Sequence, residues 1–116
     1  MIQLEICFIT MKILQNYFSN FDTSEVTEMD SMFRGCSSLT SINLNNINTK
    51  LVKTMSWMFS GCVNLTSINL PNLRALNLIR IDYMFYNCKS LKILNLSNFI
   101  APSLTTIDEP KNVGLF

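Results

Sequence analysis

Apolar residues recur along this chain at a fixed step of 26 residues. The string Met-Phe-Ser-Gly-Cys-Val-Asn-Leu-Thr-Ser-Ile-Asn-Leu at 58–70 has related copies that begin at Met32 and Met84, with no insertion between them. A fixed step in this range is typical of a solenoid, in which each repeat buries its apolar face against the next. The aligned apolar slots, which we expect to form the core, are Met29/Met55/Ile81/Ile107, Met32/Met58/Met84, Phe33/Phe59/Phe85, Cys36/Cys62/Cys88, Leu39/Leu65/Leu91, Ile42/Ile68/Leu94, Leu44/Leu70/Leu96, Phe21/Ile47/Leu73/Phe99 and Val26/Val52/Leu78/Leu104.

Each repeat contains a pattern that predicts a short β-strand. Residues 39–44 read Leu-x-x-Ile-x-Leu, in which the last two apolar residues point inward on the period of two and Asn43 points outward. The same pattern begins again at Leu65 and at Leu91. We therefore expect short parallel strands, stacked in register from one repeat to the next.

A helix of one or two turns is expected before each strand. The residues with helical spacing in the first repeat are Met29, Met32, Phe33 and Cys36. The slot at the start of this segment holds residues that cap helix N-termini, namely Asp30, Ser56, Asp82 and Asp108. The slot near its end holds residues that tolerate a left-handed φ, namely Gly35, Gly61 and Asn87.

These elements predict a fold of the α/β class, a leucine-rich-repeat solenoid of about four 26-residue rungs with short parallel strands and helices of one or two turns. The chain, 1–116, is then a single solenoid domain. Its parts are a degraded N-terminal rung at 1–28, repeats at 29–54, 55–80 and 81–106, and an incomplete C-terminal rung at 107–116. No polar cap is evident at either end, so a longer array, end-to-end self-association and a complete monomer all remain open.

Composition and charge narrow the classes of function. The chain is 48% apolar and 15% charged, which is ordinary for a folded protein. Its net charge is +1, and its nine Lys and Arg residues form no run, which argues against a nucleic-acid partner. It has no His, the most common general base near neutral pH and the most common zinc ligand. We therefore expect no enzyme activity and no cofactor.

The N-terminal stretch, residues 1–9, is apolar but does not have the features of a signal peptide. It lacks a positively charged start and contains Glu5. No apolar run in the chain approaches the roughly 18–20 residues that a membrane span requires. We expect no membrane span, and the absence of a visible signal peptide leaves a cytoplasmic location open.

Three of the four cysteines, Cys36, Cys62 and Cys88, occupy one slot of the repeat. A structural repeat explains this spacing without disulfides, since parallel side chains on a stack point the same way and three members of one ladder cannot all pair. We expect all three thiols to be reduced and buried as small apolar residues. The soft sulfur atoms of the Met and Cys ladders also suit copper, but core packing explains them and we expect no metal site.

The repeat resembles that of a known family. Met-Phe-x-Gly-Cys-x-x-Leu-x-x-Ile-x-Leu at 58–70, with Asn-Phe-Asp-Thr-Ser-x-Val-Thr-x-Met at 20–29, is similar to the BspA-like leucine-rich repeat of bacterial surface proteins, which is also abundant in mycoplasma lipoproteins of unknown function. The similarity covers roughly residues 17–107. It implies a leucine-rich solenoid without catalytic residues, secreted or at the cell surface, that is used in adhesion and protein binding.

Two functions follow, and they place the contacts differently. In the first, the chain is a non-enzymatic interaction module that binds a protein or carbohydrate ligand through the outward side chains of its strands. These residues, which form rows on the expected sheet, are Thr40, Ser41, Asn43, Thr66, Ser67, Asn69, Lys92 and Asn95. A solvated face without a ligand explains the same rows. In the second, the chain is a structural or detached repeat fragment with no ligand of its own, which stacks on further repeats through its ends near Phe18 and Leu104.

Overall fold

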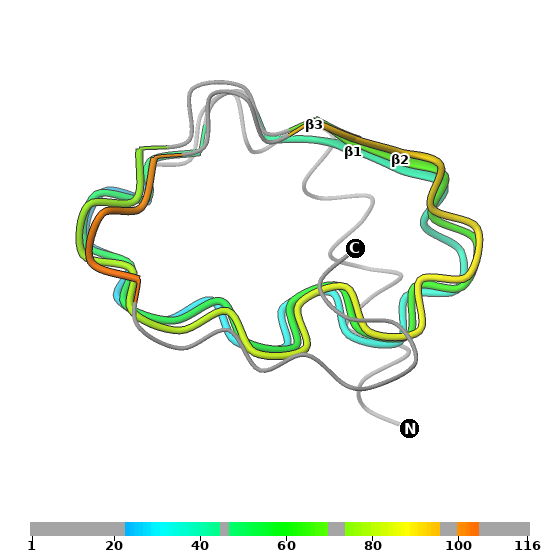
Figure 1. Ribbon diagram of the computed structural model, residues 1–116, viewed down its shortest axis with the longest axis horizontal. Coiled ribbons are helices and arrows are strands. Elements are labelled where there is room, and N and C mark those ends of the chain that lie inside the picture. The colour runs from blue at the N-terminus through cyan, green and yellow to red at the C-terminus, as the bar shows by residue number, and fades with distance from the viewer. Residues whose placement is uncertain (1–22, 45–46, 70–73, 96–99, 105–116) are drawn as a thin grey trace.

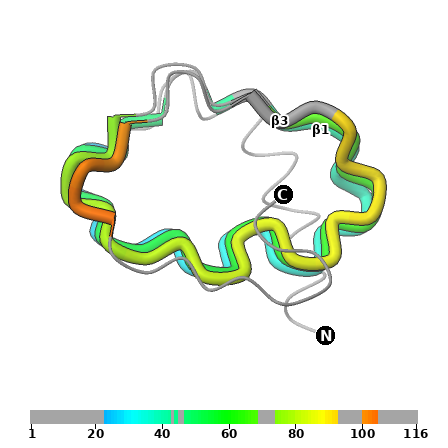
Figure 2. Tube along the Cα trace, in the orientation of Figure 1, coloured from blue at the N-terminus to red at the C-terminus, as the bar shows by residue number. Residues whose placement is uncertain are grey.

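Successive repeats follow the same path and lie against one another. The computed structural model describes residues 23–44, 47–69, 74–95 and 100–104. In Figures 1 and 2, the coloured segments trace a closed outline in which each repeat overlies the one before it. The strands lie on one side of this outline, and the segment that contains Met-Phe lies on the opposite side.

The strands form one parallel sheet that is in register with the sequence repeat. They are β1 (Ser41–Asn43), β2 (Ser67–Asn69) and β3 (Ile93–Asn95), in the order β1-β2-β3. Ile42 pairs with Ile68, and Ile68 pairs with Leu94, so the expected alignment is present. Each strand has three residues, which is shorter than the sequence pattern predicts. The pairing extends one step further at Thr66, whose amide donates to the carbonyl oxygen of Thr40 at 2.9 Å.

The segment that was expected to be helical is a series of turns, and none of the residues that the structure describes lies in a helix. The amides of alternate residues from Met29 to Gly35 donate to carbonyl oxygens from Thr54 to Ser60, at 2.7–3.0 Å. Residues 55–61 donate to residues 80–86 in the same way. Because these amides bond to the neighbouring repeat, they are not available for the i→i−4 bonds of a helix. The helix prediction is therefore wrong for these segments.

Left-handed backbone at two slots of each turn segment also excludes a regular helix. The residues are Ser31, Trp57 and Tyr83, with φ of 58°, 62° and 57°, and Gly35, Gly61 and Asn87, with φ of 73°, 77° and 61°. The amide of Cys62 closes a four-residue turn on the carbonyl of Phe59 at 3.1 Å, and Gly61 is the third residue of that turn. Positive φ at this position is the mark of a type II turn. The expectation for the glycine slot is confirmed, whereas the slot of Trp57 was not anticipated.

The expected ladders form the core. Its buried members are Met29, Phe33, Cys36, Leu39, Leu44, Val52, Met55, Met58, Phe59, Cys62, Leu65, Ile68, Ala75, Leu78, Ile81, Met84, Phe85 and Cys88. Phe59 stacks between Phe33 and Phe85, with ring centroids 5.4 and 5.6 Å apart. Half-buried members of the same ladders are Val26, Met32, Ile42, Ile47, Leu91 and Leu104. The expected core positions Phe21, Leu70, Leu73, Leu96, Phe99 and Ile107 lie outside the described residues.

One buried slot is polar and was missed by the hydrophobic pattern. Thr23, which is 4% exposed, donates from Oγ1 to the carbonyl of Asn48 at 2.9 Å and accepts from the amide of Asn48 at 2.8 Å. Thr49 occupies the next position of this slot and donates to the carbonyl of Arg74 at 3.2 Å. The third position is the buried Ala75. Since a buried hydroxyl needs a partner, the threonine side chains join one repeat to the next by hydrogen bonds. The side chain of Ala75 at the same slot only packs.

Candidate functional site

The polar residues expected to bind a ligand lie in rows across the sheet. Thr40, Thr66 and Lys92 are exposed and adjacent, because the amide of Lys92 donates to the carbonyl of Thr66 at 3.0 Å and Thr66 in turn donates to Thr40. The hydroxyl of Thr66 also donates to the carbonyl of Thr40, at 3.1 Å. The side chains of this row thus start from positions that are set by backbone hydrogen bonds between repeats.

A second and a third row follow in the strands themselves. Ser41, which is exposed, pairs with Ser67, which is half-buried, and Ser67 pairs with Ile93 of β3. The third row pairs Asn43 with Asn69 and Asn69 with Asn95 along the sheet. The structure therefore brings together the positions that the sequence singled out, in the order of the repeats.

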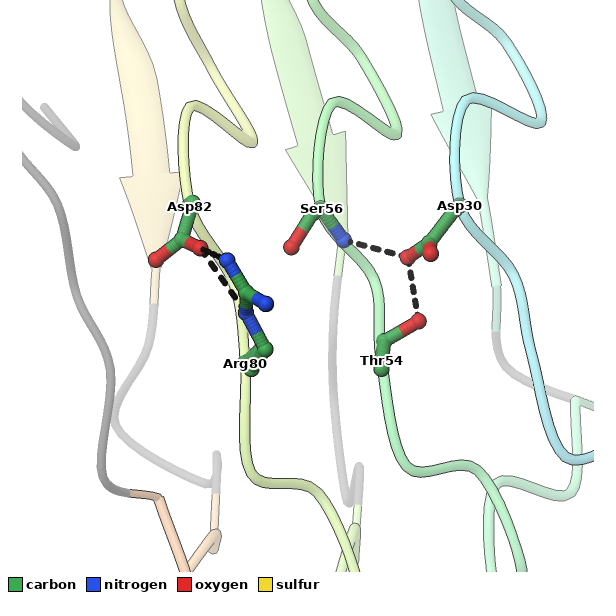
Figure 3. Close-up of polar contacts among 5 residues, drawn as sticks. All are labelled: Asp30, Thr54, Ser56, Arg80 and Asp82. Carbon is green, nitrogen blue, oxygen red and sulfur yellow. Dashed lines mark hydrogen bonds and ion pairs between the residues drawn. The ribbon is translucent and has the colours of Figure 1, made fainter.

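Asp30 joins two repeats on the part of the stack shown in Figure 3. Its Oδ1 atom accepts from the amide of Ser56 at 2.9 Å and from the hydroxyl of Thr54. The sequence predicted an N-cap for the turn that Asp30 itself begins. Instead, it caps the neighbouring repeat, because amides of its own turn such as that of Ser31 already donate to that repeat.

The third member of this slot, Asp82, is buried and paired with a cation. It is 4% exposed, and its Oδ2 atom accepts from Arg80 Nε at 3.0 Å and Nη2 at 2.5 Å (Figure 3). A carboxylate at this depth requires such a partner. The hydrogen bond to Asp82 also raises the pKa of Arg80. Ser56 lies between the two aspartates, and its buried Oγ has no hydrogen-bond partner among the described residues.

The cysteine ladder contains both free and oxidised members. Cys62 and Cys88 are buried free thiols, and each donates to the backbone carbonyl of a phenylalanine in the preceding repeat at 3.1 Å. Burial raises the pKa of Cys62 to about 12 and that of Cys88 to about 11. Cys36, in contrast, is disulfide-bonded. The prediction of a free thiol is therefore wrong for Cys36 and confirmed for Cys62 and Cys88.

An aromatic cluster that the sequence reading missed lies on the turn segments. Trp57 stacks on Tyr83 with ring centroids 4.4 Å apart, and the guanidinium carbon of Arg34 lies 4.5 Å from the centroid of the indole ring. Tyr86 packs edge-on against both rings. The available signal was the spacing, since Trp57 and Tyr83 are 26 residues apart. These contacts help to offset the left-handed φ of both residues.

One family model matches nearly the whole chain. It is described as a Mycoplasma protein of unknown function, DUF285, and it matches residues 2–108. The chain belongs to this family. For this DUF285 protein, no match was found among curated proteins or among solved structures.

The described ranges of this DUF285 protein show neither a metal-binding cluster nor a membrane-spanning helix. Within the described ranges, no group of three or more His, Cys, Asp or Glu side chains is arranged to hold a metal ion. The same part of the chain includes no helix long and apolar enough to cross a membrane. The Met and Cys ladders that were considered as soft ligands are packed in the core.

Proposed function

We propose that this DUF285 protein is a non-enzymatic interaction module of the leucine-rich-repeat type, akin to the BspA-like surface repeats. It binds a protein or carbohydrate ligand through the outward side chains of β1, β2 and β3. The observation that carries the proposal is the alignment of Thr40, Thr66 and Lys92 by hydrogen bonds between repeats. Parallel strands are about 4.8 Å apart, so the rows offer hydrogen-bonding groups at regular steps to an extended ligand.

The affinity of such a surface depends on the number of repeats. Each repeat offers only a few small polar side chains, and a single contact of this kind contributes little net free energy. Because the same groups recur in register, a ligand that spans several repeats gains from their combined effect. We therefore expect weak binding per repeat and a preference for long, repetitive ligands.

The disulfide at Cys36 supports a location outside the reducing cytosol. Disulfides persist in secreted and surface proteins, whereas cytosolic thiols are kept reduced. Together with the resemblance to surface repeats, this favours a secreted or cell-surface protein. The competing function, a structural unit that stacks on further repeats, places the important contacts at the ends near Leu104.

The proposal is tested by glycan-array and pull-down binding with the wild type and with the triple variant Asn43→Arg, Asn69→Arg and Asn95→Arg. Bulky charged side chains in the third row are expected to remove most binding, by about tenfold or more, if the ligand lies along the strands. The matched control adds the same charge at exposed positions away from the strands, as Thr27→Arg, Ser37→Arg and Ser38→Arg. This control is expected to bind like the wild type.

Unchanged binding by the Asn43, Asn69 and Asn95 variant rules out the strand face. Oligomers that depend on concentration, and that dissolve when Leu104 is replaced by Asp, support the stacking function instead. Size-exclusion chromatography over a range of concentrations distinguishes the two.

A further inference from the structure

A second surface of the protein combines exposed aliphatic side chains with cations. All the large apolar residues that stand out as exposed in the described ranges, Leu51, Leu76, Ile79 and Ile100, are 38–46% exposed. They belong to the segments 48–53, 74–80 and 100–104, which are stacked at the end of the outline drawn at the left of Figure 1. We call these four residues, with the cations described next, the basic-aliphatic edge.

The cations of this edge are Lys50, Lys53, Arg74 and Arg80, all of which are exposed. Three of them are followed, at the same slot of the next repeat, by an exposed aliphatic residue: Lys50 by Leu76, Lys53 by Ile79 and Arg74 by Ile100. The amide of Ile79 donates to the carbonyl of Lys53 at 2.8 Å, and Arg74 forms a parallel bridge with Ile100. The side-chain amide of Asn77 donates to the carbonyl of Lys50 at 2.8 Å, which places Lys50 beside the residue that follows Leu76.

The positive charge of the edge is limited to one part of the stack. Between Asp30 and Asp82 the sequence has no acidic residue. Arg80 pairs with Asp82, which is the second residue of the following repeat. Glu25 and Glu28 occupy the same end of the outline, but in the segment that precedes the first repeat. The cations therefore belong to the first two repeats and the exposed aliphatic residues to all three, and this character stops at residues 25–28.

This mixture favours a lipid surface over a protein partner. The centres of protein interfaces are enriched in Trp, Tyr and Arg, with Lys depleted and Leu under-represented among the residues that dominate binding. Surfaces that lie on anionic membranes combine Leu or Ile with Lys and Arg, because the apolar groups enter the headgroup boundary while the cations attract anionic lipids. The segments of the edge overlie one another at this end of the outline in Figure 1, so one surface can contact several repeats at once.

We propose that the basic-aliphatic edge docks this protein on an anionic lipid surface. Leu76 and Ile79 enter the headgroup region, and the flanking lysines and arginines bind the lipid phosphates. The strands lie on another side of the outline, so the polar rows remain accessible to a ligand while the edge is docked (Figure 1). Docking is reversible, since each cation near an anionic surface contributes only a small favourable free energy.

The test is co-sedimentation of the full chain with vesicles of phosphatidylglycerol and phosphatidylcholine, compared with vesicles of phosphatidylcholine alone. We expect binding to the anionic vesicles that weakens as salt is added. Lys53→Glu is expected to lower the partition coefficient about tenfold. The matched control Lys89→Glu makes the same change of charge at an exposed lysine outside the edge, and it is expected to change partition by less than about twofold.

A second variant tests the aliphatic part independently of charge. Leu76→Ser with Ile79→Ser is expected to lower partition about tenfold, while the variant still unfolds cooperatively, because side chains that are 42% and 39% exposed lie outside the buried core. Equal binding to both kinds of vesicle, equal loss in Lys53→Glu and Lys89→Glu, or full binding by the serine variant would each overturn the proposal. Lipid-free dimers that the serine variant dissolves would also overturn it, since the edge would then join two copies of the chain.

Discussion

At the scale of single residues, one slot of the repeat supports different chemistry in different repeats. Cys36 is disulfide-bonded, whereas Cys62 and Cys88 are free and buried. In another slot, Asp30 bonds to the neighbouring repeat, whereas the hydroxyl of Ser56 has no partner in the part of the chain that the structure describes. The slot determines where a side chain points, and the atoms around it then determine its protonation and its partners.

The buried thiols predict a loss of stability at alkaline pH. The native pKa values of Cys62 and Cys88 are raised to about 12 and about 11, whereas an unfolded cysteine titrates near about 8.5. Between these values the unfolded state loses protons that the native state keeps, so the free energy of unfolding falls as pH rises. Urea denaturation at several pH values from neutral to about 10.5 measures this slope.

The control for this prediction is Cys62→Ala with Cys88→Ala. The variant starts from a lower stability but is expected to lose less of it as pH rises, because its two thiols no longer titrate. The two proteins differ in no other residue. An identical slope in the two proteins would contradict the assignment of the alkaline loss to these thiols.

Asp30 and Ser56 predict opposite effects of alanine at neighbouring positions. Asp30→Ala leaves the amide of Ser56 and the hydroxyl of Thr54 without their acceptor, and is expected to lower the free energy of unfolding by about 1–2 kcal/mol. Ser56→Ala removes only an unpaired buried hydroxyl, and is expected to leave stability within about 0.5 kcal/mol or to raise it. Thermal and urea unfolding measure both. If Ser56→Ala costs as much as Asp30→Ala, the hydroxyl is not unpaired in solution.

At the scale of elements, the turn segments are held by neighbouring repeats as well as by their own local turn bonds. Alternate amides from Met29 to Gly35 donate to the next repeat. A chain segment that has to expose every second amide sideways cannot keep a uniform right-handed helix, and the positive φ values at Ser31 and Gly35 are the local consequence. These turns therefore depend on stacking for their shape.

Gly35 provides a direct test of this backbone requirement. Its φ is 73°, and a Cβ added there meets no heavy atom within 4 Å, so a substitution changes the backbone energy without a steric clash. Gly35→Ala is expected to lower the free energy of unfolding by about 1–2 kcal/mol. Gly35→Asn is expected to cost less, since Asn87 occupies the equivalent slot with φ of 61°.

The reverse substitution is the control. Asn87→Gly is expected to be tolerated, because glycine adopts this φ without strain. Chemical denaturation of the three variants gives their order. A Gly35→Ala variant as stable as the wild type would mean that the turn takes another conformation in solution.

At the scale of the whole molecule, each repeat is stabilised by contact with its neighbours. Phe59 packs between two rings, and the amides of residues 55–61 donate to residues 80–86. Val26 and Leu104, at the two limits of the described stack, are only half-buried, whereas Val52 and Leu78 of the same ladder are buried. Stability then follows from the number of interfaces between repeats.

Insertion of a second copy of residues 55–80 after Arg80 tests this additivity. The new repeat adds one more interface of the same kind, so the free energy of unfolding and the urea m-value are both expected to rise. As a control, the same 26 residues in scrambled order should leave the m-value of the cooperative transition unchanged. A lower melting temperature in the faithful insertion would show that the repeats do not stack independently of their position.

The sequence by itself determined the step, the buried ladders, the register of the strands and the left-handed slot of Gly35. These features follow from residue type and spacing, which are local properties. Thr23 shows the limit of this approach. The burial of a threonine cannot be predicted until the partner of its hydroxyl, here the backbone of Asn48, is known.

Only the tertiary structure decided how these slots are used. It replaced the expected helices by turns, separated Cys36 from the free thiols, and left Leu76 and Ile79 exposed. The physical reason is common to all three. An amide, a thiol or an aliphatic side chain takes its state from the atoms next to it, and in a stack those atoms belong to residues about 26 positions away.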